Sequence, residues 1–141
     1  MGGTNEERAE RLTRVIVAAI SGDHSQMQDV FTRDVIATGP GMRVASREQL
    51  ARELERRLGA FSERKVSVAP LDVGGDRACV EWVASGTHSG PFSLDDGGGA
   101  IAPTGRRIRL RAITVAEFDG DQICSIRSYW DGAAPLEDTD T

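Results

Sequence analysis

Cysteine is scarce in this sequence, and nothing in its spacing indicates a metal site. Cys79 and Cys124 are the two cysteines among 141 residues, and neither belongs to a paired metal-ligand motif. Both fall within predicted strands, which favours two buried free thiols in a reducing compartment. A disulfide between them is the alternative.

Long apolar runs are also missing. No stretch reaches the roughly 20 apolar residues that span a membrane. Residues 1–14 are polar and charged, unlike the apolar region of a signal peptide. The sequence therefore predicts a cytoplasmic protein with no membrane partner.

Basic residues are fewer than acidic ones: the sequence has 17 Lys and Arg residues and 22 Asp and Glu residues, and the formal net charge is −5. Nucleic-acid binding needs a basic surface, so no nucleic-acid partner is expected. The sequence contains no Walker A loop, no dinucleotide-binding glycine fingerprint and no G-x-S-x-G motif. We therefore expect no cofactor and no metal ion.

Apolar residues at helical spacing predict three helices in the N-terminal part of the chain. The first ends at Gly22, the second is short and covers 27–31, and the third starts at a capping box of Ser46 and Gln49. A short strand over 35–38 lies between the second and third helices. The apolar stripes of the two longer helices consist of Leu12, Val15, Ile16, Ala19 and Ile20, and of Leu50, Leu54, Leu58 and Phe61.

The remaining sequence is typical of β-structure. Strands are predicted over 66–73, 78–88, 106–118 and 123–131. Asp119-Gly120 is a hairpin signal, and the Gly-rich segment 89–102 is expected to be more mobile than the sheet. Helices first and strands afterwards predict an α+β fold, with three N-terminal helices on a strongly curved, mostly antiparallel sheet that forms a cone-shaped barrel. One domain is expected over 1–135, followed by a disordered acidic tail over 136–141.

The last hairpin predicts which residues share the helix-covered face. With Asp119-Gly120 at the centre of the turn, Phe118 pairs with Asp121. This register gives three cross-strand pairs: Asp131 with Ile108, Tyr129 with Leu110, and Arg127 with Ala112. Cross-strand partners share a face, so Asp131 is predicted in an apolar cavity together with Trp82 and His88.

Asp131 and His88 are the predicted catalytic residues. A carboxyl group in an apolar cavity can act as a general acid–base, and an imidazole can orient the substrate or stabilise an oxyanion. Each has a simpler alternative, since Asp131 could belong to a turn and His88 could be a surface residue at a loop. The predicted ligand contacts are Phe31, Trp82, Leu110, Arg127 and Tyr129.

The opposite face of the predicted sheet is too apolar to remain in water. It carries Ile113, Val115, Ile126 and Trp130 in the predicted register. We therefore expect a homodimer that forms through this outer face.

Several segments resemble those of a known family. They are the strand segment 80–90, the turn Pro103-Thr104-Gly105-Arg106, the hairpin segment 118–123 and the end of the last strand, Tyr129-Trp130-Asp131. Together they are similar to SnoaL-like domains of the nuclear transport factor two-like superfamily. The resemblance covers nearly the whole chain, from the first helix to Asp131.

The resemblance implies a cone of three helices on a curved sheet, which usually dimerises through its outer face. In the polyketide cyclases of this family, an aspartate on the last strand serves an intramolecular aldol ring closure without metal or cofactor. Asp131 matches that position, and His88 matches a recurrent histidine at the end of the long strand. Glu117 and Tyr129 stand where histidines often appear in cyclases.

Two functions from different classes are therefore predicted. The first is a cofactor-independent cyclase, isomerase or lyase that acts on a small hydrophobic carbonyl compound, such as a polyketide. The second is a non-catalytic module that binds a small molecule or dimerises. The Asp-Arg-Asp set of enzymes similar to limonene-epoxide hydrolase is incomplete here, because Arg109 and Arg111 have no aspartate beside them.

Overall fold

Nine helices and strands make up the described part of the chain. The computed structural model describes residues 5–71, 75–92 and 102–130. Asp131, the acidic tail over 136–141 and most of the Gly-rich segment lie outside these ranges. The elements, in chain order, are α1 (Asn5–Ile20), α2 (Met27–Val30), β1 (Phe31–Gly39), β2 (Met42–Val44), α3 (Arg47–Leu58), β3 (Phe61–Leu71), β4 (Arg77–His88), β5 (Arg107–Asp119) and β6 (Gln122–Trp130).

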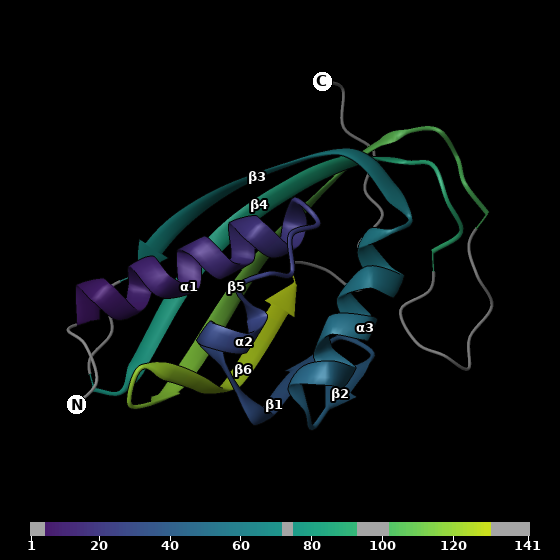
Figure 1. The fold of residues 1–141 in the computed structure, drawn as a ribbon. Coiled ribbons are helices and arrows are strands. Elements are labelled where there is room, and N and C mark those ends of the chain that lie inside the picture. Colours follow the sequence, from purple (N-terminus) through teal and green to yellow (C-terminus); the bar gives the residue numbers. More distant parts are fainter. Residues whose placement is uncertain (1–4, 72–74, 93–101, 131–141) are drawn as a thin grey trace.

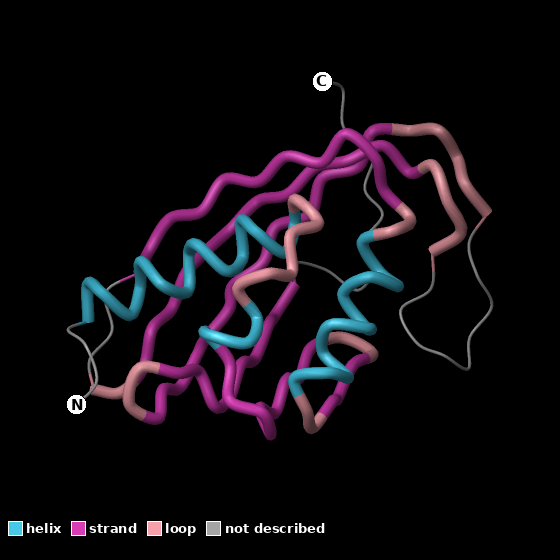
Figure 2. The backbone as a smooth tube through the Cα atoms, viewed as in Figure 1, coloured by secondary structure: helices cyan, strands magenta, loops and turns pink. Residues whose placement is uncertain are grey.

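The six strands form one curved sheet in the order β2-β1-β6-β5-β4-β3. Neighbouring strands are antiparallel, except that β1 and β6 run parallel. All three helices lie on one side of this sheet (Figure 1). Helix α1 packs on β3 and β4, whereas α3 packs on β1 at the other end of the sheet (Figure 2). The predicted α+β fold with a curved, mostly antiparallel sheet is confirmed.

The prediction of three N-terminal helices on the sheet is right only in part. Helix α3 follows β1 and β2, so the sheet begins before the last helix. The short strand β2 was not predicted, because three residues are too few for a pattern of alternation. Phe31 was expected in the second helix, but it begins β1. None of the helices in the described ranges has the length and apolar character needed to cross a bilayer.

Local sequence signals explain where α1 and α3 end and begin. Gly22 has a φ of 88°, in the left-handed region that glycine adopts without strain, and α1 ends just before it. At the start of α3, the Ser46 hydroxyl accepts a hydrogen bond from the Gln49 N–H at 3.1 Å. The Gln49 side chain accepts the N–H of Ala45 at 3.0 Å, where a full capping box would use the N–H of Ser46.

The register of the β5–β6 hairpin differs from the predicted one in two ways. Asp119 pairs with Gln122, whereas the predicted pair was Phe118 with Asp121. This difference moves the turn by one residue along the chain, and by itself it leaves each side chain on the face that was predicted for it. The register then shifts between Phe118 and Glu117, so that Cys124 is an extra residue on β6. One extra residue exchanges the two faces of every later position on that strand.

This bulge corrects the predicted faces of β6. Trp130 pairs with Ala112, and both lie on the helix-covered face, as does Ile126. The predicted placement of Ile126 and Trp130 on the outer face is wrong, and so is that of Arg127 and Tyr129 on the inner face. The outer face carries half-exposed or exposed apolar side chains instead at Ile36, Ile113, Val115 and Tyr129.

The interior is built from the apolar stripe of α1 and the inward residues of the strands. Leu12, Val35, Val80 and Ile123 have no exposed surface. Filling this interior with apolar side chains provides the main free energy of folding.

Leu12→Ala should lower the free energy of unfolding by about 2–5 kcal/mol, since it removes a fully buried side chain and leaves a cavity. Val17→Ala on the same helix is the control, because Val17 is exposed and its truncation should change stability by about 0.5 kcal/mol or less. Urea denaturation followed by circular dichroism measures both. Equal effects of the two variants would contradict the placement of α1.

The homodimer through the outer face stays a prediction. Ile113 lies on the outer face beside Tyr129, its partner on β6. Ile113→Glu would place a charge in this surface and should convert a dimer to a monomer. Sedimentation velocity at micromolar concentration is the measurement, and a monomeric wild-type protein would exclude the dimer.

Candidate functional site

A cavity of about 190 Å³ opens between the helices and the concave face of the sheet. Each helix and strand contributes to its lining, and so does Phe92, which lies beyond β4. Most of the lining is apolar, with residues such as Ile16, Leu54 and Leu110. A concave, largely apolar cavity with a few polar groups is the usual form of a small-molecule site.

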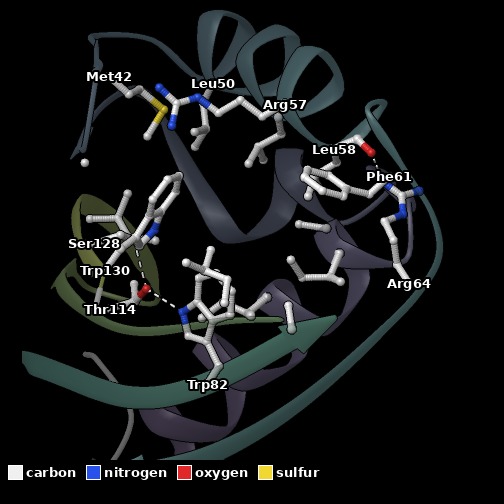
Figure 3. A pocket seen from close by; sticks show the side chains of 18 of the residues that line it. Met42, Leu50, Arg57, Leu58, Phe61, Arg64, Trp82, Thr114, Ser128 and Trp130 are labelled. Carbon is white, nitrogen blue, oxygen red and sulfur yellow. Dashed lines mark hydrogen bonds between the residues drawn. The ribbon is translucent and has the colours of Figure 1, made fainter. Parts of the chain in front are cut away.

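Three polar side chains form a hydrogen-bonded chain in the wall of the cavity. The Trp82 indole N–H donates to the Thr114 hydroxyl, with 2.8 Å between Nε1 and Oγ1. The Thr114 and Ser128 hydroxyls are also hydrogen-bonded, with 2.9 Å between their oxygens (Figure 3). The register makes this possible, because Thr114 pairs with Ser128 across β5 and β6. We call Trp82, Thr114 and Ser128 the hydroxyl relay.

Arg57 brings a buried positive charge to the cavity. Its side chain lines the cavity and is nearly fully buried, and its guanidinium carbon lies 5.7 Å from the centre of the Trp130 ring. Its Nε donates to the Glu53 carboxylate at 3.0 Å, and Arg56 donates to the same carboxylate. Burial would raise the pKa of Glu53, but the hydrogen bonds from Arg56 and Arg57 outweigh it and hold this pKa below its ordinary value.

Arg64 is the second charged residue of the lining. Its Nη1 donates to the backbone carbonyl of Leu58, the last residue of α3, at 3.0 Å. Within the described residues, the cavity lining includes these two arginines and no aspartate or glutamate. The charge of the described lining is therefore positive.

The predicted ligand contacts divide into two groups. Trp82, Phe31 and Leu110 line the cavity, as expected. Tyr129 is 56% exposed on the outer face, and Arg127 lies on the same face with its guanidinium 3.8 Å from the Glu117 carboxylate. Arg127 and Tyr129 are therefore corrected from cavity residues to outer-face residues, because the bulge at Cys124 turns them away.

His88 lies beside the cavity rather than in its lining. It is fully buried, with the Phe61 ring centre at 5.6 Å and the Phe92 ring centre at 6.5 Å, and both phenylalanines line the cavity. Its Nδ1 is hydrogen-bonded to the Thr104 hydroxyl at 3.2 Å. Its Nε2 is buried without a hydrogen-bond partner in the described structure. The alternative of a surface histidine is excluded, and the shared face of His88 and Trp82 is confirmed.

Asp131 lies outside the described residues, so its predicted place in the cavity stays a prediction. That prediction used a pairing of Asp131 with Ile108. In the observed register, Trp130, the residue before Asp131, lines the cavity.

The two cysteines are free, as predicted, with Cys79 buried and Cys124 half-buried. Burial raises the pKa of both thiols, which makes them poor nucleophiles. In the described ranges, no three His, Cys, Asp or Glu side chains are grouped to hold a metal ion.

Sequence reasoning placed Thr114 on the helix-covered face, but it missed Arg57, Arg64 and Ser128 as polar residues of the cavity. Arg57 carried a signal, because it lies seven residues after Leu50 on the stripe that also contains Leu54 and Leu58. Ser128 and its hydrogen bond to Thr114 could have been recognised only from the correct register.

Comparison with known proteins identifies the family. A family model described as SnoaL-like polyketide cyclase matches residues 10–139. The chain belongs to this family. No significant match was found among curated proteins.

Solved structures confirm the fold. A protein of Jannaschia sp. CCS1 assigned as a SnoaL-like polyketide cyclase is 17% identical, with a TM-score of 0.78 over 93% of this chain and 90% of that one. IdmH of Streptomyces antibioticus, assigned as a polyketide cyclase, is 19% identical, with a TM-score of 0.72 over 88% and 91%. An LEH-like epoxide hydrolase of M. tuberculosis is 17% identical, with a TM-score of 0.65 over 90% and 84%. At these identities the likeness extends to the fold alone.

Thr114→Val should destabilise the protein by about 1–3 kcal/mol, because it preserves the shape and leaves the buried Trp82 N–H without an acceptor. Thr114→Ser keeps the hydroxyl and is the matched control. Urea denaturation measures the free energy of unfolding of both variants. If the valine variant is at least as stable as the serine variant, the relay contributes no stability.

Proposed function

We propose that this SnoaL-like protein is a cofactor-independent cyclase, isomerase or lyase that acts on a small hydrophobic carbonyl compound by general acid–base catalysis. The observation that supports it most is the hydroxyl relay, which places a polar group at one fixed point of an otherwise apolar wall. Apolar contacts bind such a compound, and the polar point orients its carbonyl group.

The size of the cavity limits the ligand. Its volume of about 190 Å³ is below the roughly 300–1,000 Å³ of sites that hold drug-sized molecules. A compound of one or two fused rings, or a folded chain of similar size, is the ligand that we propose.

The hydrogen bonds of the relay give Ser128 its role. An indole N–H can only donate, so Thr114 accepts from Trp82 and keeps its own proton to donate. If Thr114 donates to Ser128, the Ser128 proton points to a further acceptor. In the proposed function this acceptor is the ligand carbonyl oxygen, and the hydrogen bond strengthens as negative charge develops on that oxygen.

Asp131 is the proposed base, and its assignment rests on the match to the family position at the end of the last strand. Its sequence neighbour Trp130 lines the cavity, so the proposal requires the chain to leave regular strand geometry after Trp130, because adjacent residues of a strand face opposite sides. Burial disfavours the ionised form of a carboxyl group, which makes it a stronger proton acceptor. His88 is the proposed helper, because its buried Nε2 has no partner among the described residues.

The proposed reaction begins when the carboxylate removes a proton from the carbon next to the ligand carbonyl. The C–H electron pair forms an enolate, whose oxygen accepts the Ser128 hydrogen bond. In a cyclisation, the enolate carbon then attacks a second carbonyl carbon of the same molecule. A C–C bond forms, and the new alkoxide takes back the proton from Asp131. No oxidant, reductant or cofactor is needed.

Deuterium exchange tests the proton transfer without the natural substrate. β-Tetralone is a bicyclic ketone with acidic α-protons, and its exchange in heavy water is followed by proton NMR. The wild-type protein should accelerate this exchange, and Asp131→Asn should slow the catalysed rate by about 10²–10⁴. Asp119→Asn is the control, because Asp119 is an exposed carboxylate at the end of β5.

Binding of β-tetralone is measured in parallel by quenching of tryptophan fluorescence, since Trp82 and Trp130 both line the cavity. The asparagine variant should retain the wild-type affinity within about threefold, because affinity comes from apolar contact.

The alternative is a non-catalytic binding module, and one observation favours it. The described part of the lining contains no carboxylate that could act as a base. Binding of β-tetralone with exchange no faster than in buffer would establish this alternative. Absence of binding would instead exclude the proposed ligand class.

A further inference from the structure

A bulge in β3 directs Arg64 into the cavity. Ser62 pairs with Thr87 and Lys65 pairs with Ser85, so the two residues Glu63 and Arg64 lie opposite a single residue of β4. Phe61 and Arg64, three positions apart, therefore both line the cavity, which a regular strand would not allow.

The backbone at this bulge is strained. Glu63 has a φ of 50°, the left-handed conformation, and this costs a residue with a side chain about 1–2 kcal/mol. Gly86, opposite the bulge, is closely approached by its neighbours on β3. A Cβ on it would lie 3.1 Å from Cβ of Phe61 and 3.3 Å from the Ser62 carbonyl oxygen. Such strain is found where a fold holds a side chain in a functional position.

Gly22 makes room for the guanidinium group of Arg64. A Cβ on Gly22 would lie 3.0 Å from Nη2 of Arg64, so a larger residue would displace it. The glycine after α1 thus leaves space for the guanidinium group, and the carbonyl that ends α3 accepts its hydrogen bond.

The charge of Arg64 faces no carboxylate among the described residues. Its acceptor there, the Leu58 carbonyl, is uncharged and uses one of the five N–H groups of the guanidinium. The guanidinium group matches a carboxylate in shape and can bind it through two parallel hydrogen bonds.

We propose that Arg64 binds a carboxylate group of the ligand, so that the ligand is a small hydrophobic carboxylic acid in its ionised form. The inference rests on the proposed function, because it takes the cavity as the ligand site. In the view of Figure 3, Arg64 lies at one side of the cavity, and Ser128 and Trp130 lie at the other. The ligand therefore carries its carboxylate at one end and its reacting carbonyl at the other.

Two probes of equal shape test this assignment. β-Naphthoate carries a carboxylate, and β-naphthamide is its neutral counterpart. Isothermal titration calorimetry at low salt should give the wild-type protein at least about tenfold higher affinity for naphthoate, as expected for a charge-assisted hydrogen bond. Equal affinity for the two probes would overturn the proposal.

Variants then assign this preference to Arg64. Arg64→Met should bring the ratio of the two affinities to about one, whereas Arg64→Lys should retain part of it. Arg47→Met is the matched control: Arg47 also donates to backbone carbonyls, those of Gln28 and Phe31, but it does not line the cavity. The affinity ratio of Arg47→Met should equal that of the wild type. A merely structural role of Arg64 would leave the ratio unchanged in Arg64→Met as well.

If Arg64→Met does not fold, Arg64→Gln replaces it, since a glutamine amide can still donate to the Leu58 carbonyl. A naphthoate preference that persists in the folded neutral variant would overturn the assignment. Failure of the Arg64 assignment is distinguishable from failure of the proposed function. β-Tetralone has no anionic group, so its deuterium exchange by the wild-type protein does not depend on a site for a carboxylate.

Discussion

One extra residue in the pairing of β6 with β5 decides which side chains of β6 line the cavity of this protein. Because Cys124 is bulged out of the pairing with β5, the later even-numbered positions of β6 face the helices. Ser128 then meets Thr114, and Trp130 meets Arg57. Without the bulge, Arg127 and Tyr129 would occupy these places, and the cavity would have neither the hydroxyl relay nor the Trp130 wall.

The three polar side chains that are buried in the described structure are compatible with folding because each has at least one partner. Arg57 has Glu53, Thr114 has Trp82 and Ser128, and His88 has Thr104 at one ring nitrogen. A buried polar group without a partner costs several times more than the net gain of one hydrogen bond. The polar groups nevertheless stand at the edge of an open space, so a ligand that offers acceptors can join these networks without breaking them.

The sequence was sufficient for the elements whose side chains follow a regular period. The stripe of Leu12, Val15 and Ile16 predicts α1, and the alternation on β4 correctly brings Trp82 and His88 to one face. The two bulges were not predictable, because Cys124 and Glu63 are neither glycine nor any other residue that marks an irregular strand. The errors at Arg127 and Tyr129, which were placed inside, follow from the bulge at Cys124. Arg64 lies before the predicted start of its strand and Arg57 lies on a helix, so both were overlooked for other reasons.

The parallel pairing of β1 with β6 has a consequence for how the protein forms. The last described strand lies in the middle of the sheet, between the first strand and β5. During synthesis, β1 and β2 therefore leave the ribosome long before the strand that joins them to β3, β4 and β5. Contacts between segments so distant in sequence form slowly. The unpaired edges of β1 and β5 are exposed until β6 arrives, and this interval is when a partly made chain is most open to aggregation or to capture by a chaperone.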